Sequence, residues 1–230
     1  MKKNLKNIGL ICIICIIALS LSACTNKNDK NQSESEKQTE NKTNAENIIE
    51  DTQEKNNEKS QVNVEIERGK WEDNKYTNDN LDIKLNLPND WSKYTEQQLD
   101  DMSEIQNQAL DEEQQKKIGN SMIYEVIANN LTNGSSIIVT FEPKLEIKET
   151  DYLMVVKQQL EAIEAIKYKV LEQYPTKLGE QEYQTLDVEA AELGLKQRFY
   201  IRNNGNGIIG IIITTKTDKE LSEIINFFET

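Results

Sequence analysis

The strongest constraint on what this chain can fold into is a long stretch with very few apolar residues, of which Ile48-Ile49 and the alternating Val62, Val64 and Ile66 are the exceptions. From Thr25 to about Arg68 the sequence consists mainly of Asn, Gln, Glu, Lys, Ser and Thr. Such a segment buries too little surface to offset the conformational entropy that folding would remove. We therefore predict a disordered polar linker over residues 24–68 and one folded domain over residues 69–230. As a flexible coil of about 44 residues, the linker would span on the order of 35–40 Å.

A leader precedes the linker. Lys2, Lys3 and Lys6 stand before an apolar run that extends from Ile8 to Leu21. A positive start followed by a short apolar run is typical of a secretory signal peptide. The run is shorter than the roughly 20 apolar residues that a membrane-spanning helix needs. We predict a signal peptide over residues 1–23.

The four residues Leu21-Ser22-Ala23-Cys24 resemble the lipobox of bacterial lipoproteins. In that family the cysteine thiol receives a diacylglyceryl group, and a dedicated peptidase cuts just before the cysteine. The resemblance implies lipidation at Cys24, attachment to the cell membrane through that lipid, and a location on the extracytoplasmic face. The alternative is an uncleaved membrane anchor with a chance cysteine.

The other two cysteines, Cys12 and Cys15, have the C-x-x-C spacing that elsewhere indicates redox or metal chemistry. Both lie inside the apolar leader and would be removed with it. We therefore expect Cys24 to be the only cysteine of the mature chain, with no disulfide and no reactive thiol.

The net charge and the composition argue against several classes of function. The net charge is −13, and removal of a leader with three lysines and no acids would take it to −16. This charge argues against nucleic acid as a partner and against electrostatic attraction to anionic lipid. We interpret it as a solvated acidic surface, with a cationic partner as the alternative. The chain has no histidine, which removes the commonest general base and metal ligand.

Apolar periodicity predicts eight strands after the linker. Their ranges are Trp71–Tyr76, Leu81–Leu87, Met122–Ala128, Ile137–Phe141, Lys169–Tyr174, Glu182–Ala190, Lys196–Arg202 and Ile208–Thr215. The last is the most apolar, and we predict that it is a central strand covered on both faces. Turn signals at Asn133-Gly134 and at Asn203–Gly207 predict hairpin connections.

Three segments have the periodicity of amphipathic helices. They run from the N-cap Thr95 to about Lys117, from Asp151 (capped by Thr150) to about Ile166, and from Asp218 to Phe228. Hairpins together with separate helices predict an α+β domain, with a single antiparallel sheet flanked by helices. We expect Ile211 and Phe228 to be buried.

The predicted domain opens with Tyr76-Thr77-Asn78, followed by Leu81-x-Ile83-x-Leu85-x-Leu87-Pro88-x-x-Trp91. This order resembles the opening of the PsbP-like and DcrB-like superfamily. The resemblance implies an α-β-α sandwich with a central antiparallel sheet. It also implies a non-enzymatic binding or assembly-accessory role. No catalytic or ligand-binding position is carried over with it.

Two sets of residues are candidates for binding. Oxygen ligands for Ca²⁺ crowd one region, although their spacing is not that of an EF-hand; they are Asp73, Asn74, Asn78, Asp79, Asn80 and Asp82. We expect Asx-stabilised turns there rather than a metal site. Trp71 and Trp91 each flank an apolar strand, so we expect core or edge packing, with stacking on a sugar or partner as the alternative.

No nucleophile, metal-hydrolase or nucleotide-binding motif is present. We therefore expect no enzyme activity, no cofactor, and no catalytic or metal-binding residue. The predicted function is a lipid-anchored, non-enzymatic binding or assembly-accessory domain whose partner is an unidentified protein or small molecule. Two alternatives are a cell-wall-directed hydrolase that uses acidic residues and a purely structural surface protein.

Overall fold

A computed structural model of the protein describes residues 67–108, 122–145 and 147–229. The predicted leader, the lipidation candidate Cys24 and nearly all of the predicted linker lie outside these ranges. Among the described residues, the compact unit extends from Arg68 to Glu229. Within the ranges that the structure describes, no helix is both long and apolar enough to cross a membrane.

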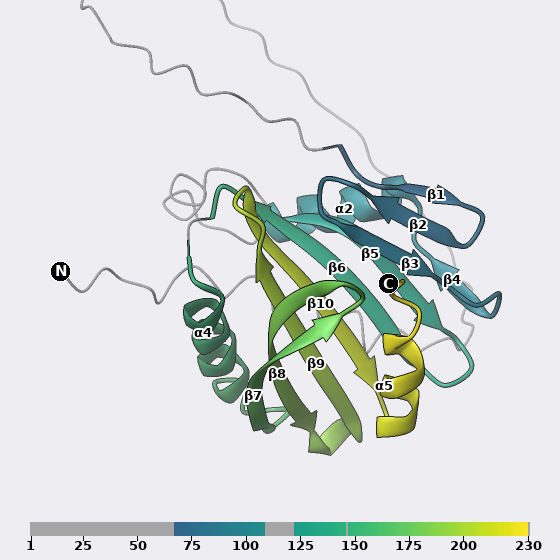
Figure 1. The fold of residues 1–230 in the computed structure, drawn as a ribbon. Helices are drawn as coiled ribbons and strands as arrows, with labels where there is room; N and C mark the ends of the chain where they lie inside the picture. The colour runs from purple at the N-terminus through teal and green to yellow at the C-terminus, as the bar shows by residue number, and fades with distance from the viewer. Residues whose placement is uncertain (1–66, 109–121, 146, 230) are drawn as a thin grey trace, which may run out of the picture. The chain divides into compact units, whose positions relative to one another are not determined.

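A seven-stranded sheet forms the middle layer, and each of its strands runs antiparallel to its neighbours (Figure 1). In spatial order the strands are β4 (Trp91–Lys93), β5 (Ile123–Asn130), β6 (Ser136–Pro143), β10 (Gly207–Thr215), β9 (Leu195–Asn203), β8 (Gln181–Ala190) and β7 (Tyr168–Leu178). β10 is the fourth of the seven strands, and all nine of its residues are buried. The prediction that this apolar run is a central strand covered on both faces is confirmed.

The prediction of a single sheet is wrong, because the segment before β4 forms a sheet of its own. Its strands are β1 (Lys70–Glu72), β2 (Lys75–Asn78) and β3 (Ile83–Asn86). The strand expected over Trp71–Tyr76 is divided by a tight turn in which Asp73 has a φ of 51°. The predicted alternation is nevertheless confirmed, since every second residue from Leu81 to Leu87 is at most 4% exposed.

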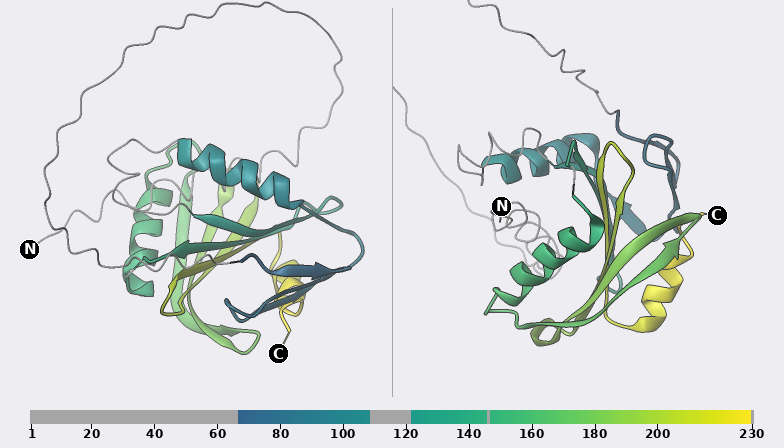
Figure 2. Two further views of the ribbon diagram at one scale, coloured as in Figure 1. Left: turned by 90° about the horizontal axis from the view of Figure 1, so that it is seen from above. Right: turned by 60° about the vertical axis from the view of Figure 1, so that its left-hand side comes forward.

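Three helices flank the seven-stranded sheet: α2 (Glu96–Gln108), α4 (Glu149–Glu161) and α5 (Asp218–Ile225). In Figures 1 and 2, α2 and α4 cover one face, while α5 and the three-stranded sheet lie on the other. The capping box predicted for α2 is present: the Gln98 N–H donates to Thr95 Oγ1 (3.3 Å), and the Thr95 N–H donates to Gln98 Oε1 (2.9 Å). The expected end of this helix near Lys117 lies outside the described residues.

The bounds predicted for the other two helices need correction. α4 begins at Glu149, with Lys148 rather than Thr150 at its N-cap, and the side chain of Glu149 accepts from the Asn203 N–H of β9 (3.0 Å). It ends at Glu161 because the chain then turns into β7. α5 ends at Ile225, since the residues after it leave the helix to pair with β3.

The main core cluster lies between the seven-stranded sheet and the α2–α4 layer. It includes Leu99 of α2, Leu153 and Leu160 of α4, and Phe199 and Ile212 of the sheet. The opposite face of β10 is also buried, and Ile211 there is fully buried, as predicted. Apolar cover on both faces of the sheet therefore comes from two separate layers.

A buried carboxylate joins the two sheets. Glu125 lies at an irregularity of the β5–β6 register, between Tyr124 and Val126, and is 1% exposed. Its Oε2 accepts from the Tyr76 hydroxyl (2.5 Å), the Asn78 amide (3.0 Å) and the Gly69 backbone N–H (3.2 Å). Burial, followed by the nearby charge of Glu125, raises the pKa of Tyr76. One side chain thus holds three donors of the N-terminal layer against the main sheet.

The first prediction concerns Phe228, which is 7% exposed and pairs with Leu85 across an isolated bridge. Phe228→Ala should lower the free energy of unfolding by about 3–5 kcal/mol, because it removes a buried ring and leaves a cavity. Urea unfolding of the full chain measures this. Phe227→Ala, which removes a half-buried neighbour, is the control and should cost less. A loss below about 1 kcal/mol for Phe228→Ala would contradict the observed docking.

The second prediction concerns Glu125. Glu125→Ala should lower the free energy of unfolding by about 3 kcal/mol or more, because three buried donors lose their acceptor and each orphaned group costs about 1–3 kcal/mol. Glu125→Gln keeps an acceptor oxygen of the same shape and should cost clearly less. Equal losses for the two variants would show that packing, not hydrogen bonding, accounts for the effect.

Candidate functional site

The candidate site lies beside the C-terminal tail, which we define as Phe227, Phe228 and Glu229. The tail runs along β3: the Asn86 N–H donates to the Phe227 carbonyl (2.8 Å), and the Glu229 N–H donates to the Lys84 carbonyl (3.2 Å). It separates two clefts. Phe227 lines one of them, and Phe228 and Glu229 line the other.

The first cleft, here called the aromatic cleft, has a volume of about 440 Å³. The rings of Trp91 and Phe227 meet edge to face, with centroids 5.5 Å apart and planes at 90°. Both side chains are half-buried, so part of each faces the cleft. The full lining is Pro88, Asp90, Trp91, Asn130, Asn133, Glu220, Glu223, Ile224, Asn226 and Phe227.

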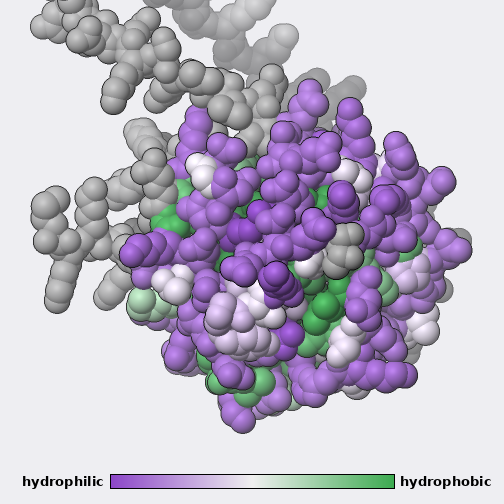
Figure 3. Space-filling model, viewed as in Figure 1, coloured by the Kyte–Doolittle hydropathy of each residue, from purple (hydrophilic) through white to green (hydrophobic). Residues whose placement is uncertain are grey.

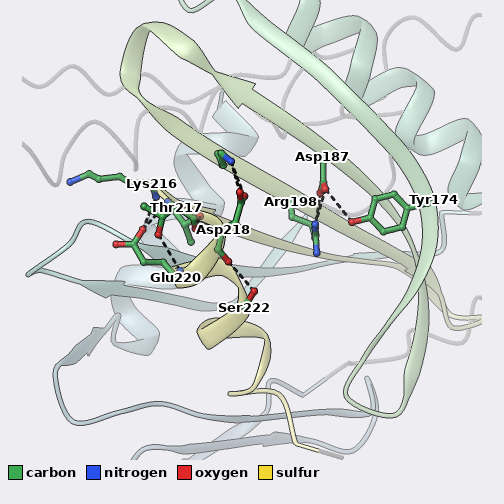
Figure 4. A network of polar contacts seen from close by, with 10 residues as sticks. Tyr174, Asp187, Arg198, Lys216, Thr217, Asp218, Glu220 and Ser222 are labelled. Carbon is green, nitrogen blue, oxygen red and sulfur yellow. Dashed lines mark hydrogen bonds and ion pairs between the residues drawn. The ribbon is translucent and has the colours of Figure 1, made fainter.

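Two of the carboxylates in the aromatic cleft are fixed by hydrogen bonds. The Asn130 side-chain amide donates to Asp90 Oδ2 (2.9 Å). Glu220 Oε2 accepts from the backbone N–H groups of Lys216 (3.0 Å) and Thr217 (2.9 Å) at the start of α5 (Figure 4). This capping box arises from the local sequence of α5, with Thr217 as N-cap and Glu220 three residues later. Two fixed carboxylates therefore line the same cleft as the Trp91 and Phe227 rings.

The second cleft, here called the polar cleft, has a volume of about 230 Å³. Its lining is Asn78, Asp79, Asp82, Ile83, Lys84, Leu178, Gly179, Glu180, Gln181, Tyr183, Phe228 and Glu229. The two aromatic rings in this lining are buried, so the cleft presents mainly polar groups.

Arg202 of β9 fixes the loops around the polar cleft. Its guanidinium donates to the Leu81 carbonyl and to Gln181 Oε1 (3.1 Å), and it lies 3.6 Å from Asp82 Oδ2. It also lies over the ring of Tyr183, 5.4 Å from the ring centre. Burial raises the pKa of Tyr183, and the charge of Arg202 opposes that rise. Because Arg202 is 9% exposed, these contacts support the structure rather than offer a free cation.

The six candidate Ca²⁺ ligands are not brought together. Asp73 and Asn74 lie at one end of β2, where Asn74 donates to Asn89 Oδ1 (2.6 Å). At the other end, Asn78 Oδ1 accepts from the N–H groups of Asn80 (3.0 Å) and Leu81 (3.1 Å), which is an Asx turn. Within the described ranges, no group of three or more Asp, Glu, His or Cys residues is placed to hold a metal ion.

The two tryptophans lie on edge strands. Trp71 of β1 contacts the ring of Tyr76 at 5.1 Å, and Lys93 Nζ of β4 lies 4.4 Å from its ring centre. Its packing therefore joins the edges of the two sheets. Trp91 of β4 faces the aromatic cleft. Sequence analysis singled out Trp91 but missed Phe227, because no local pattern places the tail beside β4.

Figure 4 shows a second polar cluster on the sheet face next to α5. Arg198 donates twice to Asp187 (2.6 and 2.7 Å), and the Tyr174 hydroxyl donates to Asp187 Oδ2 (3.1 Å). The hydrogen bond with Asp187 raises the pKa of Arg198. Burial, then the charge of Asp187, raises the pKa of Tyr174 to about 12. The partners satisfy one another, so we regard this cluster as structural.

The molecular surface seen in Figure 3 is mainly hydrophilic, with small separate apolar patches among the described residues. Stable interfaces that rely on apolar contact need larger continuous patches. A partner that binds this face would therefore have to use polar and charged contacts.

Comparisons with known proteins add little to this description. No family model matches the sequence, and no curated protein matches it. Among solved structures, the chain is similar to the solution structure of cyanobacterial PsbP (CyanoP) from Synechocystis sp. PCC 6803. The identity is 13% and the TM-score 0.42, over 68% of this chain and 91% of that chain.

The third prediction compares the stability contributed by a partly buried ion pair with that of an exposed ion pair. Asp187→Asn should lower the free energy of unfolding by about 1–2 kcal/mol, because it weakens a half-buried bidentate pair with Arg198. Asp218→Asn is the matched control. Asp218 pairs with Lys196 at 2.7 Å, but its side chain is 79% exposed, so water screens the pair and the loss should be smaller. Thermal unfolding of both variants tests the order, and a larger loss for Asp218→Asn would contradict it.

Proposed function

We propose that this protein is a non-enzymatic binding domain that is held by lipid at the extracytoplasmic face of a cell membrane. The observation that carries the proposal is Leu21-Ser22-Ala23-Cys24 directly after a lysine-led apolar leader. A polar segment and then a compact domain follow it. This order suits an anchor, a spacer and a binding unit. An assembly-accessory role is also what the resemblance to the PsbP-like superfamily implies.

The clefts favour binding over hydrolysis by acidic residues. A glycoside hydrolase needs two carboxyl groups that flank the bond to be cut, one of them free to give a proton. In the aromatic cleft, Asp90 and Glu220 are engaged by an amide and by backbone N–H groups. In the polar cleft, Asp82 lies near Arg202, and Glu229 pairs with Lys75 at 2.9 Å. These four of the seven carboxylates that line the two clefts are engaged in contacts that shape them.

If the protein were a purely structural surface protein, the aromatic cleft would have no role. Two half-buried aromatic side chains at a cleft of about 440 Å³ expose apolar surface that water solvates poorly. We therefore propose that a ligand or partner occupies this cleft. The acidic charge of the chain argues against nucleic acid as that partner.

The fourth prediction tests the anchor. Cys24→Ser should abolish incorporation of labelled fatty acid and the cut before residue 24, because the thiol is the acceptor of the lipid. Two buried acyl chains hold a protein stably, at about 0.8 kcal/mol for each CH₂, and the acidic chain gains nothing from anionic lipid. The uncut variant would keep its apolar leader, so fatty-acid labelling and N-terminal mass analysis are better readouts than membrane fractionation.

Cys15→Ser is the matched control, because it removes a thiol from the same leader and should leave labelling intact. If wild-type protein takes up no label, or if its mature N-terminus is not Cys24, the proposed anchor and location fail.

A further inference from the structure

We infer that the aromatic cleft binds the ammonium or guanidinium group of a lysine or arginine side chain in a basic segment of a partner polypeptide. The inference rests on the proposed binding role and specifies its ligand. It does not depend on the lipid anchor. Three features of the described residues support it: the half-buried ring of Trp91, the charge of the lining, and the polar rim.

The first feature is the ring of Trp91. Cations are attracted to the faces of aromatic rings, most strongly to tryptophan, within about 6 Å of the ring centre. This domain already uses that contact internally: Lys93 lies over Trp71 (4.4 Å), and Arg202 lies over Tyr183 (5.4 Å). Within the part of the chain that the structure describes, no lysine or arginine lies over Trp91 in this way. Trp91 is half-buried and lines the cleft beside Phe227.

The second feature is charge. The lining of the aromatic cleft contains three carboxylates and no lysine or arginine; the carboxylates belong to Asp90, Glu220 and Glu223. Hydrogen bonds hold the first two in place. Glu223 pairs with Lys219 at 3.5 Å, in an ion pair whose lysine side chain is 85% exposed. Such a surface pair contributes little stability, so a ligand cation can replace the lysine.

The comparison between the two clefts strengthens the argument. The polar cleft is also acidic, but Lys84 lies in its lining, and the rings of Tyr183 and Phe228 are 4% and 7% exposed. It therefore offers carboxylates without an accessible ring face. The lining of the aromatic cleft combines half-buried ring surface with three carboxylates and no lysine or arginine, which is the chemistry that attracts an alkylammonium or guanidinium group.

The third feature favours a polypeptide over a small cation. The aromatic cleft is larger than a lone ammonium group needs, and its lining also includes the carboxamides of Asn133 and Asn226. The Asn226 carboxamide can donate to and accept from a peptide backbone, and the Asn133 carboxamide, whose Oδ1 accepts from the Ser135 N–H (2.9 Å), can still donate. A basic side chain can lie against Trp91 while its own backbone meets these amides. The same cleft would repel an acidic segment.

The binding experiment can use Trp91 as a reporter, because the chain has only two tryptophans. Trp71→Phe keeps an aromatic ring against Tyr76 and leaves Trp91 as the sole indole. This variant, full-length in non-ionic detergent, would be titrated with a blocked five-residue peptide of alternating glycine and lysine. We expect a saturable change in tryptophan fluorescence that added salt weakens. The same peptide with acetylated lysines should give no change, because it keeps the stem but loses the charge.

Cleft variants in the same background locate the site. Glu223→Gln and Asp90→Asn should each raise Kd about threefold, and together about tenfold, because each removes one screened charge contact. Asp79→Asn in the polar cleft is the matched control and should leave Kd unchanged. Unfolding midpoints for all variants show whether the domain stays folded.

Three results would overturn the inference. One is a fluorescence change that never saturates. Another is an equal loss of affinity for Asp79→Asn and Glu223→Gln, which would show that only net charge matters. The third is equal affinity for lysine amide and for the peptide, which would identify a small cation as the ligand. Fatty-acid labelling tests the anchor separately, so the two proposals can fail independently.

Discussion

The structure depends on covering β10 on both faces. This strand is mainly isoleucine, is buried over its whole length and lies fourth among seven, so each of its faces needs its own layer. Helices α2 and α4 supply one layer from the middle of the chain. The other is assembled from the two ends of the domain: the β1–β3 sheet comes first in sequence, and α5 with its tail comes last. Both clefts lie where these end segments meet the main sheet, so the requirement to cover β10 also creates the candidate site.

Polar contacts hold that composite layer in place. Glu125 and Arg202 reach from the main sheet to the N-terminal layer, and each is almost fully buried. Buried charges are costly unless hydrogen bonds compensate them, and here the partners include backbone groups at Gly69 and Leu81. Such contacts specify one docking geometry in a way that apolar packing alone does not. The cleft walls are consequently built on fixed elements, which is what a selective binding surface requires.

Much of the fold could be predicted because its signals are local. The alternation from Leu81 to Leu87 and the apolar run of β10 each identified a buried strand. Predictions failed where the deciding contact is distant in sequence. Nothing near Trp71 shows that its strand leaves the main sheet, and the three residues of β4 are too few to display a period. The helix pattern after Asp218 includes Phe228, but pairing with Leu85 removes that residue from the helix. The aromatic cleft was missed for the same reason, since Trp91 and Phe227 meet only after the chain has folded.

The proposed lipid anchor would strengthen the proposed binding of a basic partner segment. If Cys24 carries lipid, the linker confines the domain to a layer near the membrane, which raises its effective concentration toward any partner held there. A single cation at the aromatic cleft gains little energy, because surface charge contacts and ring contacts are each weak in water. Confinement near the membrane would compensate for weak contacts, so that binding would not require a large apolar interface. The face shown in Figure 3 has no large apolar patch among the described residues. Weak, charge-selective and reversible association is therefore the kind of binding that this combination of anchor, linker and cleft would support.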